Sequence, residues 1–113
     1  MSNICTENTD QVTASMRKAA KEATAMLRAL ANEDRLLLLC QLSQGEKSVS
    51  ELEELLGIHQ PSLSQQLGVL RTEGMVSTRR DGKRIYYSIA DLKVLAMLQT
   101  MYEIYCPKQE NER

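Results

Sequence analysis

Three cysteines carry the most reactive side chains of this chain: Cys5, Cys40 and Cys106. A cysteine thiolate can attack an electrophile, bind a soft metal ion or join a second thiol in a bridge. Cys40 ends an apolar run that starts at Leu36, so on its own it is better explained as a small side chain packed in a core. Cys106 stands directly before Pro107 and on its own is better explained as a packed residue at a helix end. Cys5 lies in a polar stretch, and we expect it to be incidental or at most a spare thiol.

The segment from Pro61 to about Glu73 is predicted to form a helix with one polar face. Leu63, Leu67 and Leu70 recur at helical spacing and mark its buried face. Short polar side chains and one glycine occupy the opposite face and the helix N-terminus: Gln60, Ser62, Ser64, Gln65 and Gly68. Gln can form two hydrogen bonds with adenine, Ser can bond a base or a phosphate, and Gly permits close approach of the backbone. Since Glu and Lys, the usual residues of a solvated face, are absent there, the pattern favours a helix that reads DNA.

Two strand-like runs follow this helix, Met75 to Arg80 and Lys83 to Ile89. Asp81-Gly82 between them is a strong hairpin signal, because a type I′ turn requires positive φ angles. Three cations surround the turn: Arg80, Lys83 and Arg84. On their own they are equally well explained by a solvated hairpin tip, but directly after a DNA-reading helix they favour contacts with phosphates or the minor groove. Arg71 and Arg79 are either further phosphate contacts or partners in surface salt bridges.

The remaining segments are predicted to be helices whose ends are marked by capping residues. Their predicted ranges are about Asp10 to Leu30, Asn32 to Leu42, Ser48 to Gly57 and Asp91 to Cys106. Asn32, Ser48 and Asp91 suit N-cap positions, and Gly57 suits a helix end. The predicted fold is mainly α with a small β-hairpin wing, in the order α-α-α-α-β-β-α. Two helices joined by a tight turn and followed by a hairpin describe a winged helix-turn-helix.

We expect a single domain over residues 10–106, with a flexible N-terminus at 1–9 and a flexible tail at 107–113. The last predicted helix is apolar on two sides, with Leu92, Leu95 and Leu98 on one and Val94, Met97 and Met101 on the other. Such a helix must be buried on both sides, and a second subunit is the natural cover in so short a chain. We therefore expect a homodimer through the first and last helices, bound to pseudo-palindromic double-stranded DNA. Burial of this helix within a monomer is the disfavoured alternative.

The formal net charge of −1 argues mildly against a strong non-specific binder of nucleic acid. The cations of the hairpin nevertheless form a local patch, and the local patch decides contact with phosphates. No apolar run has the length of a membrane span, and the N-terminus lacks the pattern of an export signal, so we expect a cytoplasmic protein without membrane contact. An enzyme would need His59 as a base beside a cysteine, but these residues fall in different parts of the predicted fold. We therefore expect neither an enzyme nor a cofactor.

Two segments resemble repressors of the ArsR type: Gln60-Pro-Ser-Leu-Ser-Gln-Gln-Leu-Gly-Val-Leu-Arg-Thr-Glu-Gly-Met-Val and Arg79-Arg-Asp-Gly-Lys-Arg-Ile-Tyr-Tyr-Ser-Ile. The resemblance covers roughly Ala25 to Cys106 and implies a DNA-binding transcriptional repressor. The first segment, taken with Cys40 and Cys106, is similar to the group of BigR, SqrR and YgaV. That similarity implies that Cys40 and Cys106 are sensing thiols, which respond to reactive sulfur species such as persulfides. Their reaction would release the operator and derepress genes of sulfide detoxification.

In ArsR-type folds the second helix packs near the last one, so the resemblance implies that Cys40 and Cys106 can meet within one subunit. A direct disulfide requires Cα atoms about 4.4–6.8 Å apart. A bridge with extra sulfur atoms spans a larger gap, which peroxide chemistry does not close. This is a hypothesis for selectivity toward persulfides. Which thiol attacks first stays open, because a helix C-terminus disfavours a thiolate whereas the nearby Lys108 favours one.

Other readings of the cysteines and of the fold also stay open. The third predicted helix has no cysteine pair and His59 is the only histidine, so we expect no metal site. A soft-metal site made of Cys40 and Cys106 alone would be short of ligands. A constitutive repressor with structural cysteines shares every motif except the switch. A winged helix used only for protein contacts is disfavoured by the polar reading face and the cationic hairpin.

Overall fold

The computed structural model describes residues 10–106, with side chains from Thr13 onward. The flexible segments predicted at 1–9 and 107–113, and Cys5 among them, lie outside the described residues. The elements run in the order α1 (Asp10–Leu30), α2 (Glu33–Leu42), β1 (Lys47–Ser48), α3 (Val49–Leu56), α4 (Ser62–Thr72), β2 (Val76–Asp81), β3 (Arg84–Ile89) and α5 (Leu92–Tyr105). The predicted mainly helical winged fold is confirmed, with one strand more than predicted.

The helix boundaries follow from local capping. The Asn32 side chain accepts a hydrogen bond from the backbone of Arg35 at 3.0 Å and begins α2. Ser48 and Glu51 form a reciprocal capping box at the start of α3, and Gly57 ends that helix with φ of 67°. Because these signals lie within a few residues of each boundary, the sequence is sufficient to predict them. Pro61 differs from the prediction, since it is the N-cap residue of α4 rather than part of its first turn.

The sheet has three antiparallel strands in the order β1-β3-β2. Strands β2 and β3 form the predicted hairpin, in which Asp81 pairs with Arg84 next to the turn. Gly82 adopts φ of 66° in that turn, a value that glycine reaches without steric cost. Strand β1 was not predicted; Lys47 pairs with Tyr87 and Ser48 with Tyr86. This short strand fixes the start of α3 to the middle of β3.

A leucine-rich core joins all five helices to the hairpin. Its α4 residues are Leu63, Leu67 and Leu70, which are 0%, 1% and 0% exposed, so the predicted buried face is confirmed. Buried side chains from the other elements complete the core: Ala29, Leu30, Leu38, Leu39, Leu42, Leu52, Ile58, Met75, Val76, Val94 and Leu98. The core therefore holds α4 by one face and leaves the opposite face to solvent.

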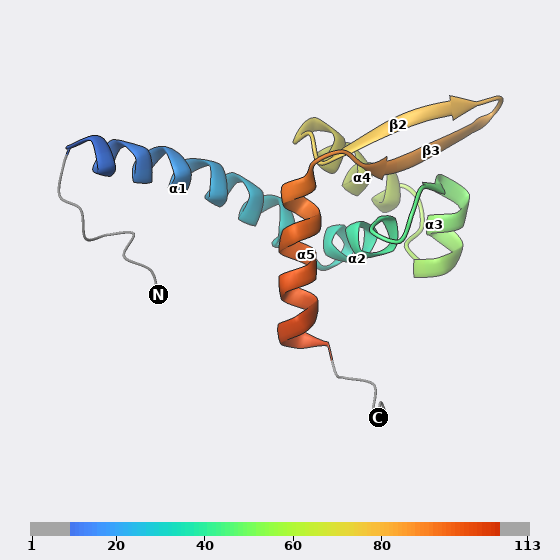
Figure 1. Ribbon diagram of the computed structural model, residues 1–113. Helices are drawn as coiled ribbons and strands as arrows, with labels where there is room; N and C mark the ends of the chain where they lie inside the picture. The colour runs from blue at the N-terminus through green and yellow to red at the C-terminus, as the bar shows by residue number, and fades with distance from the viewer. Residues whose placement is uncertain (1–9, 107–113) are drawn as a thin grey trace.

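Helix α1 is attached to this body mainly at its C-terminal end. Figure 1 shows α1 extending away on one side, while the β2–β3 hairpin extends on the other. Ala29 and Leu30 in its last turn are buried, whereas Leu27 is half exposed. Most of the described α1 side chains therefore have no cover within the chain. Within residues 10–106, no helix combines the length and the apolar composition that crossing a membrane requires.

Candidate nucleic-acid interface and thiol pair

The outward face of α4 carries the residues predicted to read DNA. Gln60, Ser64, Gln65 and Gly68 are exposed and Ser62 is half-buried. Gln60 is partly committed within the protein, because its side-chain oxygen accepts hydrogen bonds from the Ser64 backbone at 3.2 Å and from the Ser64 hydroxyl at 2.5 Å. Gln60 thus acts as a cap for the start of α4, which leaves its NH₂ group as the donor available to DNA. Gln65 and Gly68 border a shallow hollow on the same helix face.

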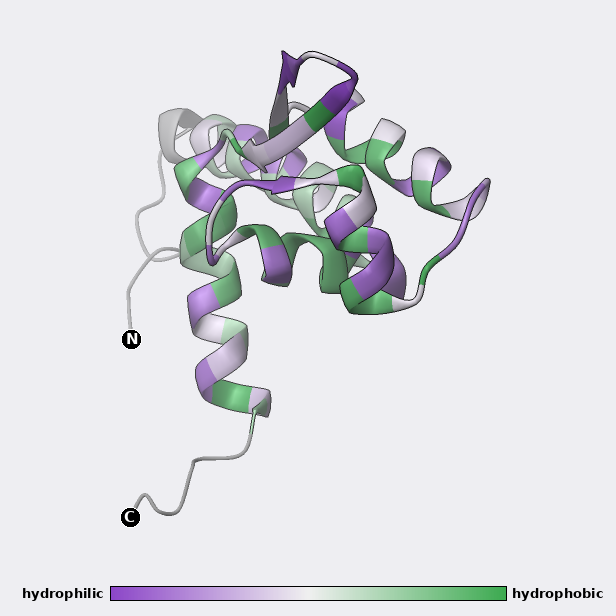
Figure 2. Cartoon of the chain, turned by 90° about the vertical axis from the view of Figure 1, so that its right-hand side faces the viewer, coloured by the Kyte–Doolittle hydropathy of each residue, from purple (hydrophilic) through white to green (hydrophobic). Residues whose placement is uncertain are grey.

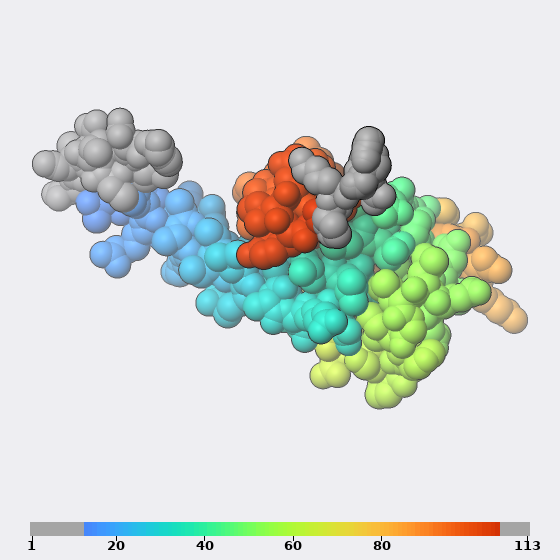
Figure 3. Space-filling view, turned by 90° about the horizontal axis from the view of Figure 1, so that it is seen from below, coloured from blue at the N-terminus to red at the C-terminus, as the bar shows by residue number. Residues whose placement is uncertain are grey.

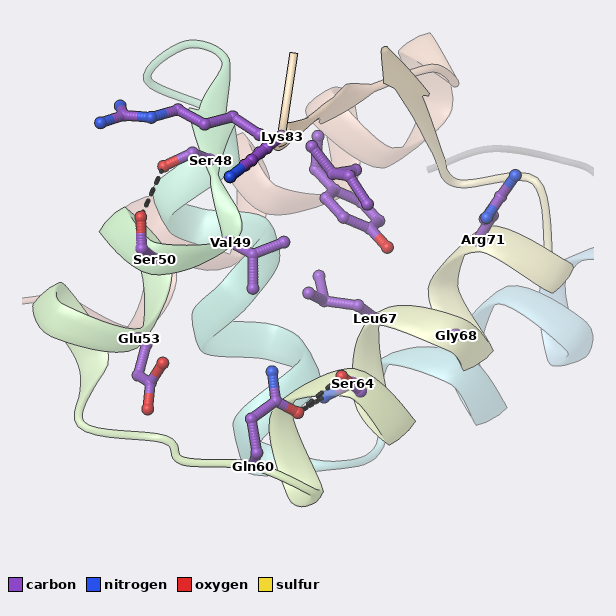
Figure 4. A pocket seen from close by; sticks show the side chains of 13 residues that line it. Ser48, Val49, Ser50, Glu53, Gln60, Ser64, Leu67, Gly68, Arg71 and Lys83 are labelled. Atoms are coloured by element: carbon purple, nitrogen blue, oxygen red, sulfur yellow. Dashed lines mark hydrogen bonds between the residues drawn. The ribbon is translucent and has the colours of Figure 1, made fainter. Parts of the chain in front are cut away.

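A cleft of about 560 Å³ lies between α3, α4 and β3 (Figure 4). Its wall residues include apolar side chains and three cations, which are Arg71, Lys83 and Arg84. Ser50 of α3 and Tyr87 of β3 also border the cleft, and sequence reasoning missed both. The sequence holds no local signal for them, because they come near α4 through tertiary structure. The pairing of β1 with β3 holds α3 beside β3. A surface cleft with cations at its wall suits the phosphate backbone of a nucleic acid.

The tip of the hairpin is hydrophilic, as Figure 2 shows. Arg80, Lys83 and Arg84 are exposed there, and none of them takes part in an ion pair recorded among the described side chains. Three cations without recorded carboxylate partners are available to an external anion. Lys83 and Arg84 line the cleft together with Gln60, Ser64 and Gly68, so these predicted wing and α4 residues share one site.

Arg79 forms a salt bridge within the wing. Its Nε and Nη2 atoms donate to the two carboxylate oxygens of Glu46 at 2.9 and 2.7 Å. Its guanidinium also lies 4.6 Å from the ring centre of Tyr86. The hydrogen bond from Arg79 lowers the pKa of Glu46 and in turn raises the pKa of Arg79. Of the two roles that the sequence left open for Arg79, the salt bridge is the one found.

His59 lies in the connection between α3 and α4, where its Nδ1 is 3.1 Å from the Glu53 carboxylate. The bond recorded for this ring is thus to an acid and not to a thiol. A cysteine nucleophile activated by His59 finds no support in this geometry.

Cys40 of α2 and Cys106 at the end of α5 are both free and exposed. Within the single chain, neither thiol is packed in the core. Partial burial of its thiol raises the pKa of Cys40, and negative charge on Cys106 raises that pKa further. The two thiols belong to different elements, and Figure 3 looks along α5 from its C-terminal end. Within the described part of the chain, no group of three or more His, Cys, Asp or Glu side chains is arranged to hold a metal ion.

Comparison with known proteins places this geometry in a family. Residues 32–78 match the model of the bacterial regulatory proteins of the arsR family. The biofilm growth-associated repressor of Agrobacterium fabrum is 50% identical over 96 residues, which cover 85% of this chain and 82% of that protein. The chain belongs to the ArsR family.

Solved structures of bacterial transcriptional regulators have the same fold as this chain. The transcriptional repressor BigR from Xylella fastidiosa superposes with a TM-score of 0.80 at 45% identity, over 85% of this chain and 98% of that one. Reduced HlyU from Vibrio cholerae superposes with a TM-score of 0.78 at 39% identity, over 82% and 98% of the two chains. The ArsR-type resemblance seen in the sequence, including the similarity to BigR, is confirmed. This ArsR-family chain is a DNA-binding transcriptional repressor and not an enzyme.

Proposed function

We propose that this ArsR-family repressor releases its operator when reactive sulfur species bridge Cys40 and Cys106. The observation that carries the proposal is the pair of exposed thiols on two different elements, near enough for charge on Cys106 to raise the pKa of Cys40. Neither thiol is committed to a disulfide or to packing in the core. One similar solved structure is that of HlyU from Vibrio cholerae in its reduced form. The redox state is thus specified for the structure of a relative.

In the proposed complex, α4 lies in the major groove and the hairpin follows the phosphate backbone. Gln65 and the NH₂ group of Gln60 donate to base edges, and Gly68 lets the helix backbone come close. Ser62 and Ser64 bond a base or a phosphate. Arg80, Lys83 and Arg84 contact phosphates or the minor groove, and Arg71 at the cleft wall adds a further phosphate contact. These roles are supported by the exposure of all of these residues except the half-buried Ser62. They are also supported by the position of six of them around one cleft: Gln60, Ser64, Gly68, Arg71, Lys83 and Arg84.

The proposed repressor is a homodimer through α1 and α5 that reads a pseudo-palindrome. A groove of about 590 Å³ between these helices is lined largely by Ala and Met side chains, among them Ala23, Met26 and Met97. Leu92, Ile104 and Tyr105 of α5 are between 66% and 79% exposed, which is unusual for such residues on a monomer surface. A second copy supplies matching apolar helices, because a two-fold interface uses the same surface twice.

The bridge forms in two nucleophilic steps. A thiolate of the pair attacks an inner sulfur of a hydropolysulfide; a protein S–S bond forms, the S–S bond of the donor breaks, and a shorter hydrosulfide leaves with the electron pair. When the attacked atom is the sulfur next to the SH end of the donor, the protein then carries Cys–S–S–SH. The second thiolate attacks the middle sulfur of this group and expels HS⁻, which leaves one added sulfur between the two cysteine sulfurs. The thiols are oxidised by two electrons and the donor sulfur is reduced.

A bridge from α2 to the end of α5 acts on the dimer helices. Because α5 is one of the proposed dimer helices, a covalent tie to α2 favours one arrangement of the two subunits over another. The spacing of the two α4 helices changes with that arrangement. The bridged protein is therefore expected to bind the operator more weakly than the reduced protein.

The test compares intact mass and operator affinity after treatment with polysulfide or with peroxide. Cys5→Ser removes the third thiol, and Cys40→Ser and Cys106→Ser are made in that background. A duplex selected from a random library by the reduced protein serves as operator. We expect polysulfide, but not peroxide, to produce a Cys40–Cys106 bridge with added sulfur and to lower operator affinity, and either single variant to lose both effects.

Equal operator affinity of the bridged and reduced proteins would overturn the switch. Thiols left unmodified by polysulfide would instead support a constitutive repressor with structural cysteines. Titration with a soft metal ion is the third arm: a loss of operator affinity there, without a bridge, would indicate a soft-metal-responsive repressor.

A further inference from the structure

Arg35 connects the end of α1 to the DNA-reading helix α4. Its Nε donates to the carbonyl of Ala29 at 2.6 Å, and its Nη2 donates to the carbonyl of Arg28 at 3.2 Å. Both carbonyls lie in the last turn of α1, where helix carbonyls lack partners within the helix and a cation is favoured. The third donor of the guanidinium, Nη1, bonds the side-chain oxygen of Gln66 in α4 at 2.9 Å.

The position of Arg35 is itself fixed. Its backbone N–H is bonded by the Asn32 side chain at 3.0 Å, so the residue is anchored at the start of α2. Arg35 and Gln66 are both half-buried. No ion pair of Arg35 with a carboxylate is recorded among residues 13–106. The guanidinium therefore acts through directional hydrogen bonds to neutral acceptors. Because it is planar and its N–H groups have fixed directions, it sets the positions of these acceptors relative to one another, which the single ammonium group of a lysine cannot do.

Gln66 is poorly placed to read DNA directly, because its side-chain oxygen accepts the hydrogen bond from Arg35 within the protein. Its neighbour Gln65 and Gly68 are exposed. We infer that Arg35 is a positioning residue, which acts through Gln66 to set the angle between α1 and α4. In a dimer formed through α1, that angle determines the distance between the two α4 helices and hence the half-site spacing that the repressor accepts.

This inference rests on the proposed dimer, and the experiment separates the two. Gln66→Met removes the acceptor at nearly constant volume, and Gln66→Glu keeps an acceptor for Arg35. Gln41→Met is the matched control, since Gln41 is also half-buried and no side-chain hydrogen bond is recorded for it among the described residues. Each protein is titrated with the selected operator and with duplexes that carry one base pair more or fewer between the half-sites.

We expect wild-type protein to bind the selected spacing best and Gln66→Met to lose about tenfold of that discrimination, the factor expected for one hydrogen bond to a charged group. Gln66→Glu should retain the discrimination even if its added charge lowers affinity for every duplex. Gln41→Met should behave as wild type. A merely structural role would lower affinity equally at all spacings and lower the melting temperature.

A Gln66→Met protein with the wild-type spacing preference would overturn the inference while leaving the dimer standing. A wild-type protein without any spacing preference would instead contradict the proposed dimer. Arg35→Lys provides a second variant if Gln66→Met does not fold, because Lys retains the charge but not the fork. It should show the same flattened spacing preference, and a preserved preference would again overturn the inference.

Discussion

At the scale of single residues, the surroundings of Cys40 bear on its reactivity. Burial and the charge of Cys106 both raise the pKa of Cys40. Since the thiolate is the nucleophile, a raised pKa slows the attack of Cys40 near neutral pH. The sequence alone could not predict this shift, because Cys106 belongs to a different element.

The first prediction concerns the pH at which Cys40 reacts. In the Cys5→Ser background, Cys106→Ser should shift the pH profile of Cys40 alkylation by iodoacetamide to lower pH, because one of the two causes of its raised pKa is removed. Peptide mass spectrometry after brief labelling at a series of pH values measures this. Cys40 in the Cys5→Ser protein provides the reference profile. A Cys40 profile unaffected by Cys106→Ser would show that the two thiols do not interact.

The second prediction separates base reading from phosphate contact. Gln65→Ala should cost about 1–3 kcal/mol on the preferred operator and relax the preference at one position of each half-site. Lys83→Gln should weaken binding to all duplexes alike and reduce the slope of log affinity against log salt by about 1. Fluorescence anisotropy on an operator library at several salt concentrations distinguishes these results. Lys18→Gln, at an exposed position of α1, is the control. A uniform loss from Gln65→Ala would argue against base reading.

Local patterns predicted the reading helix but not every residue around it. The helical spacing of Leu63, Leu67 and Leu70 predicts a buried face, because this pattern can be recognised without knowledge of distant contacts. The role of Arg79 depends on Glu46, and the role of Arg35 on Gln66, and both partners are remote in the sequence. The exposure of Cys40 could not be predicted for another reason. Four consecutive leucines precede it and point to all sides of the helix, so the sequence does not show which side is buried.

At the scale of elements, the hairpin was predictable and the third strand was not. Asp81-Gly82 signals a tight turn by itself, whereas the two residues of β1 are too few to show an alternating pattern. The pairing of β1 with β3 shapes the cleft, because it brings the start of α3 to the middle of β3. The bond between Arg79 of β2 and Glu46, directly before β1, reinforces this junction.

The third prediction concerns that junction. The pKa of Glu46 is lowered in the folded protein, so its stabilising effect is complete above the ordinary pKa of Glu and is lost as the pH falls through the lowered value. Glu46→Gln should therefore reduce stability slightly at pH 7, by the small amount usual for an exposed ion pair, and should equal wild type in acid. Urea unfolding at a series of pH values measures the difference. Glu54→Gln, another exposed acid, should show no such trend. A difference that persists in acid would exclude the ionised pair as its cause.

At the scale of the whole molecule, the single chain leaves its two end helices without enough cover. The sequence predicted this from the apolar sides of the last helix, since a short chain lacks the residues to bury both. The direction of α1 could not be predicted in this way. It depends on the angle between α1 and α2, where Arg35 of α2 bonds the last turn of α1. Helix α1 extends away from the body and presents Leu27 to solvent (Figure 1).

The last prediction tests whether α1 contributes to a dimer. Leu27 of α1 and Leu55 of α3 are 50% and 55% exposed, so their substitution by Asp is matched in chemistry and in accessibility. In a dimer through α1 and α5, Leu27→Asp buries an unpaired charge at the interface and should yield a monomer, whereas Leu55→Asp should not. Without its second half-site contact, the Leu27→Asp protein should lose about two orders of magnitude in operator affinity. Sedimentation equilibrium and anisotropy titrations measure both effects. A dimeric Leu27→Asp protein would exclude Leu27 from the interface, and a monomeric Leu55→Asp protein would move the interface to α3.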